Sequence, residues 1–493
     1  MLIWFAIRPG VKNLTNSSTL FLVNCLCFLF QNMSSDVGSA VKEALSFSLM
    51  LKLVSFAISV LTVRFTSITD YGKISVHFQL LTSASMFVLK EGVRRAALKS
   101  DFGMEIMVFG VSFTSLVVVP LGALFFSSLS SEPFWFILLV SVSLVLECVA
   151  ELFMFYQVSI KGNLGIRNRA ETWSSLARAA VMLIVLIFVR DGGVFAFACS
   201  QVSSAIVLVS VPAYSQLRIP LPVRTMPTKV RRQLGEMCVM SVQKLVLAEG
   251  ERLLSIVFLS PDQIGLVSVV SNLGSLVLRL VFAPIEEVAF TGMTKVRNYA
   301  KNISIFKSVF LVQSAVGLLA ASFGPVLSES VLALLYGEKW LDAVPLLQMY
   351  CVMIFVFSVN GCFEAFFFAS ADSTRIRMSF VAQWVSFAAM VLSVSGLAGY
   401  GPICILIGNT VSMAVRIAFA SISFKQVTDV FHPNCVRVYR TILVGGLCNA
   451  VLVRQGQGYH KRLPLGVGLL VGGFTVLLVS LPLRRVLTNL TSK

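Results

Sequence analysis

Ionisable side chains interrupt several long apolar segments of this sequence, and some share a helix face. Glu147 and Glu151 are four residues apart, and Glu249 and Arg252 are three apart, so each pair lies on one face of a helix. A charge inside a bilayer is costly unless it is paired or hydrated, which makes each such residue a functional hypothesis. The other residues of this kind are Arg178, Lys244, Glu251, Arg279, Glu286, Glu287, Glu364 and Arg416.

Two interpretations of these groups remain open from the sequence. In the first, they form structural ion pairs or extend to the ends of helices, where their charges reach water. In the second, they line a polar cavity that receives an anionic headgroup, because a planar guanidinium can donate two hydrogen bonds to one phosphate. Arg279 and Arg416 stand in otherwise apolar segments and favour the cavity, whereas Lys244 favours ion pairing.

The motifs of common enzymes and ATP-driven pumps are absent from the sequence. It contains no GxxxxGK[ST] phosphate-binding loop, no HExxH and no GxSxG. Its ten cysteines and three histidines show no metal-ligand spacing. We therefore expect no catalytic residues, no metal and no cofactor, and we do not expect an enzyme or a channel.

The composition requires a nonaqueous environment for much of the chain. Of 493 residues, 57% are hydrophobic and only 13% are charged, and the mean hydropathy is +0.86. Soluble domains carry about 25% charged residues. The net charge of +17 resides mainly in short connectors, which is typical of membrane topology and does not indicate a nucleic-acid partner.

Apolar segments of bilayer-spanning length recur along the chain, and we expect about fourteen transmembrane helices. They are predicted near residues 41–64, 72–91, 103–127, 133–156, 171–190, 193–215, 234–259, 262–289, 303–327, 343–370, 376–398, 401–424, 439–453 and 463–483. Lysine and arginine gather in the connectors after even-numbered spans, which predicts that both termini are cytosolic.

The arrangement of spans predicts an all-α polytopic membrane protein with two six-helix lobes around a central cavity and a C-terminal helix pair. The predicted divisions are an N-terminal extension at 1–38, an N-lobe at 39–217, a cytosolic connector at 218–232, a C-lobe at 233–425, and two helices with a tail at 426–493. Six is an even number, so the lobes would have parallel orientation. The extension is either a signal-like segment or an addition without structural role.

Several motifs together resemble one known family. Lys90–Ala96 resembles [RK]-E-x-x-R-R-A, and Ala248–Arg252 resembles T-E-G-[DE]-R, with Ala248 in place of threonine. Asn272–Glu287 resembles N-L-G-S-L followed by R and F-x-P-x-E-E. Asn360–Phe366 and Asn409–Ile417 resemble two later motifs, N-G-x-x-E-[AC]-F and N-x-x-x-M-x-x-R-[IL]. The family is the eukaryotic "requiring fifty-three" or Rft-type family of the multidrug/oligosaccharidyl-lipid/polysaccharide flippase superfamily.

The resemblance covers roughly residues 40–485 and implies a function. It implies a multi-pass protein of the endoplasmic reticulum membrane that moves dolichol-diphosphate-linked Man/GlcNAc oligosaccharide from the cytosolic to the luminal leaflet for protein N-glycosylation. The alternative is a non-transporting accessory factor of the glycosylation machinery. The expected partners are the dolichol-linked oligosaccharide, membrane lipid and proteins of the glycosylation pathway.

The predicted substrate-binding residues follow from these motifs and from the chemistry of the headgroup. Basic residues would contact the diphosphate, and acidic and amide groups would bind the sugars or form ion pairs that differ between states. Asn272 and Asn360 with Gly274 and Gly361 would allow close helix approach or bending. For Arg94 and Arg95, the alternative is that they fix topology or bind anionic lipid. The full predicted set is Arg94, Arg95, Arg279, Arg416, Glu249, Arg252, Glu286, Glu287, Asn360 and Glu364.

Overall fold

The computed structural model describes residues 57–98, 100–129, 134–162, 165–189, 192–215, 225–295, 299–424, 433–456 and 475. Within these ranges the chain forms helices joined by short turns, and no β-strand occurs. The predicted extension at 1–38, most of the span at 41–64 and, apart from residue 475, the span at 463–483 lie outside the described ranges.

Six helical stretches make up the first half of the described chain. Residues 57–65 are helical, and a continuous helix follows from Ile68 to Leu98. It comprises α4 (Ile68–Gly72), η1 (Lys73–Phe78), α5 (Gln79–Phe87), η2 (Val88–Val93) and α6 (Arg94–Leu98). The next four stretches are α7 (Gly103–Phe113) with η3 (Thr114–Val118) and α8 (Val119–Leu129), α9 (Phe134–Phe155) with η4 (Tyr156–Ile160), α10 (Gly165–Phe188) and α11 (Gly193–Ser215).

The second half begins with a long helix and continues with further spanning helices. These elements are α12 (Thr228–Phe258), α13 (Pro261–Val277) with η5 (Leu278–Phe282) and α14 (Ala283–Lys295), α15 (Tyr299–Leu335), η6 (Glu338–Ala343), α16 (Val344–Ser370), α17 (Ser373–Gly396), η7 (Ala398–Tyr400), α18 (Ile403–Ser423) and α19 (Pro433–Gly456). The start of α13 is well defined, because Ser260 and Gln263 form a reciprocal capping box and Pro261 occupies the first turn.

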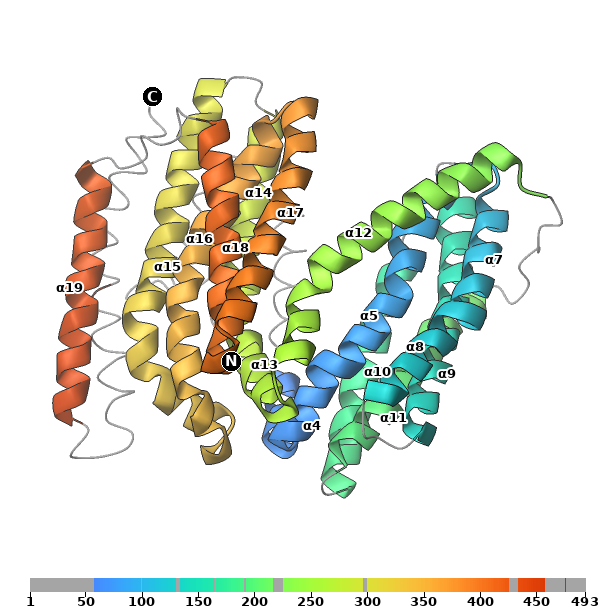
Figure 1. Cartoon of the computed structure of the whole chain (residues 1–493), viewed down its shortest axis with the longest axis horizontal. Coiled ribbons are helices and arrows are strands. Elements are labelled where there is room, and N and C mark those ends of the chain that lie inside the picture. The colour runs from blue at the N-terminus through green and yellow to red at the C-terminus, as the bar shows by residue number, and fades with distance from the viewer. Residues whose placement is uncertain are drawn as a thin grey trace, which may run out of the picture.

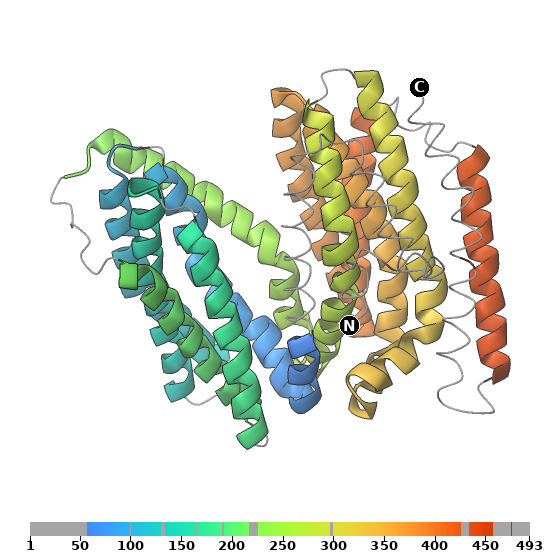
Figure 2. The same cartoon turned by 180° about the vertical axis from the view of Figure 1, so that it is seen from behind.

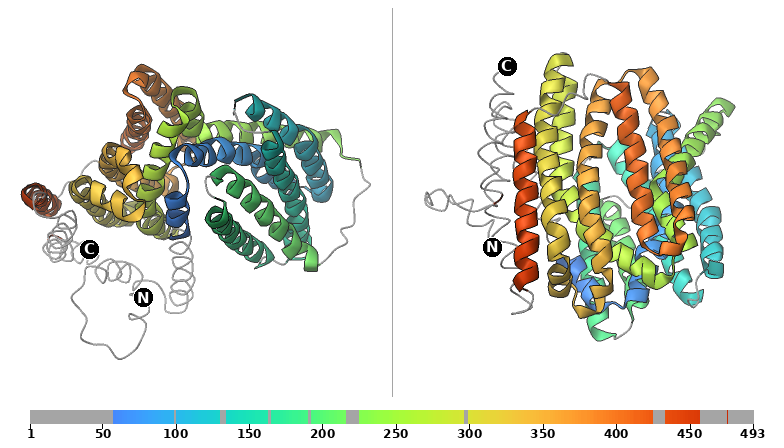
Figure 3. Two further views of the ribbon diagram at one scale, coloured as in Figure 1. Left: turned by 90° about the horizontal axis from the view of Figure 1, so that it is seen from below. Right: turned by 60° about the vertical axis from the view of Figure 1, so that its left-hand side comes forward.

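The helices form two lobes that meet at one end and diverge at the other (Figures 1 and 2). The N-lobe contains α4 to α11, and the C-lobe contains α13 to α18. They meet where α4 packs against α13, and we call this contact the vertex. Helix α12 runs obliquely between the lobes and packs against η2 and α5 on one side and α17 and α18 on the other. Helix α19 packs on α15 at the edge of the C-lobe farthest from the N-lobe (Figure 3).

Nine described helices are long and apolar enough to cross a bilayer. They correspond to nine of the predicted spans, so the prediction of a polytopic all-α membrane protein is confirmed, although the count of about fourteen is not. The predicted spans at 72–91 and 234–259 form helices 68–98 and 228–258, and 439–453 lies within α19. The helix at 228–258 is α12, and it carries four charged residues in its second half, namely Lys244, Glu249, Glu251 and Arg252.

Large apolar side chains cover much of the outer surface of the lobes. Leu116, Phe188 and Leu392 are 77%, 82% and 72% exposed, while separate clusters of buried apolar residues fill each lobe. Exposed apolar surface on this scale is not compatible with water and matches a lipid-facing surface. Each lobe is therefore packed internally around its own apolar core.

Candidate functional site

A cluster of charged side chains lies inside the N-lobe, between η2, α6, α9 and α10. Its acidic members, Glu147 and Glu151 on α9, are 8% and 2% exposed. Lys90 Nζ lies 3.5 Å from Glu147 and 3.9 Å from Glu151, and Arg94 Nη1 lies 3.6 Å from Glu151. We call this set, together with Arg167 and Arg178, the N-lobe charge cluster. The shared helix face that was predicted for the two glutamates is confirmed.

Helix α10 supplies the other two bases of this cluster. Arg167 Nη2 lies 3.9 Å from Glu151, and Arg178 Nη2 lies 4.0 Å from Glu147. Arg178 also donates to Ser204 Oγ at 2.9 Å, and Ser204 bonds to Ser174 at 2.7 Å. Arg167 also pairs with Glu171 on its own helix at 2.8 Å, so four bases face three carboxylates and one positive charge is in excess. Opposite charges at these separations stabilise the otherwise costly buried carboxylates.

Arg95 does not join this cluster. Its side chain is 53% exposed and pairs with Glu91 one helical turn away, with Arg95 Nη2 at 2.5 Å from the carboxylate. An exposed pair of this kind within one helix contributes little to stability. The two adjacent arginines of the same motif therefore have different surroundings, since Arg94 faces the lobe interior and Arg95 faces outward.

A second polar network lies at the vertex and involves α4, α13 and η5. Asn272 Nδ2 donates to Ser59 Oγ at 2.7 Å and to Tyr71 Oη at 3.4 Å. Arg279 Nη2 donates to Asn272 Oδ1 at 3.3 Å and to Ser275 Oγ at 2.9 Å. The side chain of Arg279 is nevertheless exposed. Its own helix therefore holds the guanidinium in place while the side chain stays accessible from outside the lobe core.

Helix α12 carries two further polar contacts near the vertex. Arg252 Nη1 lies 2.5 Å from Glu249 Oε2, which confirms the predicted pair. Asn409 Nδ2 of α18 donates to Glu251 Oε2 at 2.8 Å. The first contact is local to α12, and the second joins α12 to the C-lobe.

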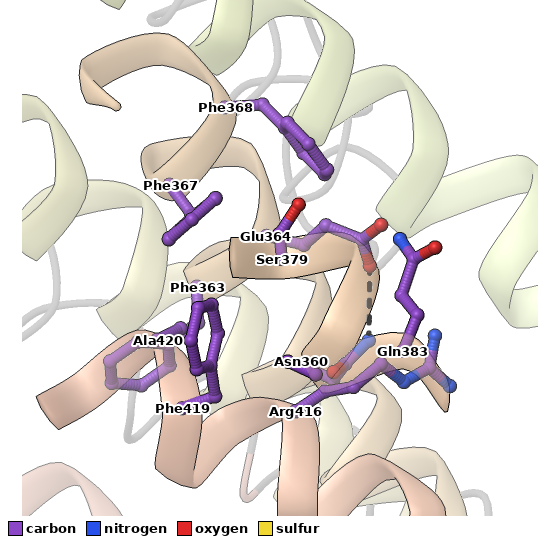
Figure 4. Close-up of a pocket in the computed structure, with 11 residues that line it drawn as sticks. Asn360, Phe363, Glu364, Phe367, Phe368, Ser379, Gln383, Arg416, Phe419 and Ala420 are labelled. Carbon is purple, nitrogen blue, oxygen red and sulfur yellow. Dashed lines mark hydrogen bonds between the residues drawn. The ribbon is translucent and has the colours of Figure 1, made fainter. Parts of the chain in front are cut away.

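A hollow opens between α16, α17 and α18 in the C-lobe (Figure 4). It is partly open to the outside, and the space between its walls amounts to about 390 Å³ when the solvent at its mouth is included. Asn360 Nδ2 donates to Glu364 Oε2 at 3.3 Å along one wall. The residues that line this C-lobe hollow are Asn360, Phe363, Glu364, Phe367, Phe368, Ser379, Ala382, Gln383, Arg416, Phe419 and Ala420.

A chain of hydrogen bonds lies beside the hollow and depends on a glycine. Gln313 Nε2 donates to Glu286 Oε1 at 2.5 Å, and Cys362 Sγ donates to Gln313 Oε1 at 3.2 Å. A β-carbon at Gly361 would collide with the Glu286 carboxylate, and one at Gly274 would collide with the ring of Tyr350. The close helix approach that was predicted at these two glycines is therefore confirmed.

The ten predicted site residues do not converge on one point. Arg94 lies in the N-lobe charge cluster, and Arg279 lies at the vertex with the Glu249–Arg252 pair nearby on α12. Asn360, Glu364 and Arg416 line the C-lobe hollow, Glu286 lies beside it, and Glu287 is exposed on α14. Other contributors were not in the predicted set, among them Lys90, Arg167, Gln313 and Gln383. Uncharged amides in apolar helices are the signal that would have identified the last two. Among the described residues, no group of three or more potential metal ligands occurs.

The sequence as a whole matches a known family profile. The profile described as Rft protein, Rft-1, covers residues 39–490. The chain belongs to the Rft family.

Relatives in this family carry a common name. A Mus musculus protein named Man(5)GlcNAc(2)-PP-dolichol translocation protein RFT1 is 25% identical over 80% of this chain and 82% of its own length. Proteins of the same name from Xenopus tropicalis and Drosophila melanogaster are 24% and 23% identical, over 78% and 86% of this chain and 81% and 92% of their own lengths.

Two solved transporter structures share the fold of this chain. The lipid II flippase MurJ in an inward closed conformation aligns over 90% of this chain and 98% of its own, with a TM-score of 0.65 and 14% identity. An inward-facing multidrug resistance MATE family transporter of the MOP superfamily aligns over 77% of this chain and 95% of its own, with a TM-score of 0.50 and 13% identity. This Rft protein therefore has the two-lobed fold of these transporters.

The vertex of this Rft protein is closed by contacts between the two halves of the chain. Thr69 Oγ1 donates to Asp262 Oδ1 between α4 and α13. Lys339 Nζ in η6 donates to the carbonyl oxygens of Arg64 at 3.0 Å and Thr66 at 2.6 Å, at the C-terminal end of the helix at 57–65. A cation is favourable at a helix C-terminus, where carbonyl groups lack partners. The lobes are thus held together at this end.

Proposed function

We propose that this protein translocates dolichol-diphosphate-linked Man/GlcNAc oligosaccharide from the cytosolic to the luminal leaflet of the endoplasmic reticulum membrane, for protein N-glycosylation. Its family, the names of its relatives and its transporter-like fold support this function. The physical problem is that a sugar-diphosphate headgroup loses its hydrogen bonds in hydrocarbon. The lobes have apolar outer surfaces and carry polar groups inside. Such groups can bind the headgroup while the polyprenyl tail stays in lipid.

The observation that carries the proposal is a closed vertex opposite a divergent end. Helices α6, α9 with η4, and α11 end at the divergent end, and α7, α10 and α12 begin there (Figure 1). The basic connectors follow those helix ends in the sequence, so the positive-inside rule assigns the divergent end to the cytosol. In this orientation both termini are cytosolic, and the headgroup enters from the cytosolic leaflet.

The closed vertex then acts as the luminal gate. To release a headgroup into the lumen, the lobes must separate at α4 and α13 and come together at the cytosolic end, as in alternating access. The Thr69–Asp262 bond and the Lys339 contacts break in that step. The sequence contains no ATP-binding motif, so net transport follows the gradient of the lipid-linked sugar, which luminal consumption maintains.

Different polar residues bind the diphosphate and the sugars of the headgroup. Arg279 is exposed at the vertex and preoriented by Asn272 and Ser275, and it contacts the diphosphate. Arg94 and Arg95 attract the diphosphate at the cytosolic end. Asn360, Glu364, Glu286 and Glu287 on the C-lobe bind the sugars. The Glu249–Arg252 pair lies on α12 near the vertex. No covalent chemistry is required.

Reconstitution tests this function. The purified protein in liposomes, supplied with labelled Man(5)GlcNAc(2)-PP-dolichol, is expected to move the label across the bilayer, and Arg279→Glu is expected to reduce the rate by more than about tenfold. The matched control is Arg232→Glu on α12, whose side chain is 83% exposed and forms an ion pair with Glu236 on the same helix. Wild-type protein that binds the lipid without moving it would contradict translocation and support the accessory role.

A further inference from the structure

The C-lobe hollow has a charge balance that is unusual for a phosphate site. Arg416 is its only basic lining residue and Glu364 its only acidic one, and the other polar members, Asn360, Ser379 and Gln383, are uncharged. A diphosphate entering the hollow would meet a carboxylate as well as a guanidinium, so the attraction and the repulsion largely cancel. An uncharged ligand does not incur this repulsion.

Arg416 also has a hydrogen-bonding group without a partner. Its Nε atom is buried and makes no hydrogen bond within the described residues. A buried donor without an acceptor is destabilising, so a ligand oxygen that accepts a hydrogen bond from it is favourable. Arginine only donates and an ionised glutamate only accepts, whereas a hydroxyl group does both. A ligand with several hydroxyl groups can therefore satisfy Arg416 and Glu364 at the same time.

The remaining wall of the hollow is aromatic. Phe363, Phe367 and Phe419 face the polar tips of Glu364, Gln383 and Arg416 across the hollow in Figure 4. Phenylalanine rings offer broad apolar surface on which the C–H face of a pyranose packs while its hydroxyl edge remains free. The hollow is small and partly open to the outside, so only one end of a larger ligand lies within it while the rest stays outside.

We propose that the C-lobe hollow is a subsite for one uncharged sugar unit, in which Arg416 and Gln383 bond its hydroxyl groups and the phenylalanines cover its apolar face. The inference rests on the proposed function for the identity of the sugar-bearing lipid. It replaces the sequence-based role of Arg416 as a diphosphate contact. It places the sugars on the C-lobe and leaves the diphosphate to the arginines nearer the N-lobe.

A comparison of two lipids tests this assignment. Binding to the purified full chain in detergent is measured for dolichyl diphosphate with and without the Man(5)GlcNAc(2) group. Gln383→Leu and Arg416→Leu are expected to weaken binding of the sugar-bearing lipid by about tenfold and binding of the bare lipid by less than about twofold. The matched control is Gln348→Leu, which lies on α16 outside the hollow and is expected to leave both affinities unchanged.

The outcomes separate the sugar site from the proposed function. Equal weakening of both lipids by Arg416→Leu would assign Arg416 to the diphosphate and overturn the proposal, as would no weakening of either. Binding of free methyl mannoside or N-acetylglucosamine is measured by saturation-transfer NMR, which does not depend on translocation. If the wild-type protein gives a sugar signal and Gln383→Leu abolishes it without changing thermal stability, the subsite is supported even if liposome transport fails. If the wild-type protein gives no sugar signal, the proposal is overturned.

Discussion

Glu151 illustrates how a membrane helix accommodates a buried charge. Its carboxylate is 2% exposed, and Lys90, Arg94 and Arg167 each place a nitrogen within 3.9 Å of it. Loss of one partner from a buried ion pair is strongly destabilising because the remaining charges stay uncompensated. Glu171, on the next helix, pairs with the same Arg167 but has a side chain that is 52% exposed.

This contrast makes a prediction about stability. Glu151→Gln is expected to lower the free energy of unfolding by about 3–5 kcal/mol, whereas Glu171→Gln is expected to change it by less than about 1 kcal/mol. Thermal and denaturant unfolding in one detergent compare the two variants, both of which remove a partner of Arg167. Equal decreases in the free energy of unfolding for the two variants would show that burial of the carboxylate does not determine how much it stabilises the protein.

Those residue contacts that are local in the chain could be predicted from the sequence. The Glu249–Arg252 pair and the shared face of Glu147 and Glu151 follow from helical spacing alone. The convergence of Lys90, Arg94, Arg167 and Arg178 on the same two glutamates could not be predicted, because it depends on how three separate helices pack. The role of Arg94 as a diphosphate contact stays a prediction, and in this structure its nearest ionic partner is Glu151.

Among the helices, the length of an apolar segment predicted the helix bounds well where the helix ends at the same residues as the apolar segment. The predicted spans at 103–127 and 193–215 match the helices at 103–129 and 193–215 closely. Other helices extend beyond their apolar parts. Helix α12 begins at Thr228 where residue 234 was predicted, because its first turns contain Arg231 and Arg232, which are good helix formers but not apolar.

Helices α4 and α13 approach each other closely at two glycines, Gly72 and Gly265. A β-carbon at Gly72 would collide with the Pro261 carbonyl oxygen and the Gly265 amide, and one at Gly265 would collide with the Ile68 carbonyl. Because backbone cannot yield as a flexible side chain does, Gly72→Ala is expected to separate the helices and destabilise the protein by about 1–3 kcal/mol.

A glycine without neighbours is the control for this variant. No atom lies within 4 Å of the β-carbon position at Gly235 in α12, so Gly235→Ala is expected to stabilise the helix by about 0.5–1 kcal/mol. Unfolding temperatures measure both changes. A Gly72→Ala protein as stable as the wild type would show that the vertex tolerates separation of these helices.

At the scale of the whole molecule, the two lobes are predicted to exchange which end is closed. Thr69 and Asp262 are bonded across the vertex, so the double variant Thr69→Cys with Asp262→Cys is expected to form a disulfide under oxidation. The disulfide is expected to stop translocation in liposomes by holding the vertex shut, and a reducing agent is expected to restore it. The two single-cysteine variants under the same oxidation are the controls.

One outcome of the cross-linking experiment would contradict this model of transport. Full translocation by protein shown to be cross-linked would mean that the headgroup crosses without separation of α4 and α13. The vertex would then be a permanent joint and not the luminal gate.

The backbone contact between Gly72 and Gly265 also determines how movement is amplified across the molecule. While the vertex is closed, the lobes can tilt about this contact, and the helices that extend from it are long. Helix α12, with 31 residues, extends about 46 Å at a rise of about 1.5 Å per residue. A tilt of about ten degrees at such a fulcrum swings the far tip of a lever that long by about 8 Å. Modest angular change near one membrane face therefore becomes a large aperture at the other.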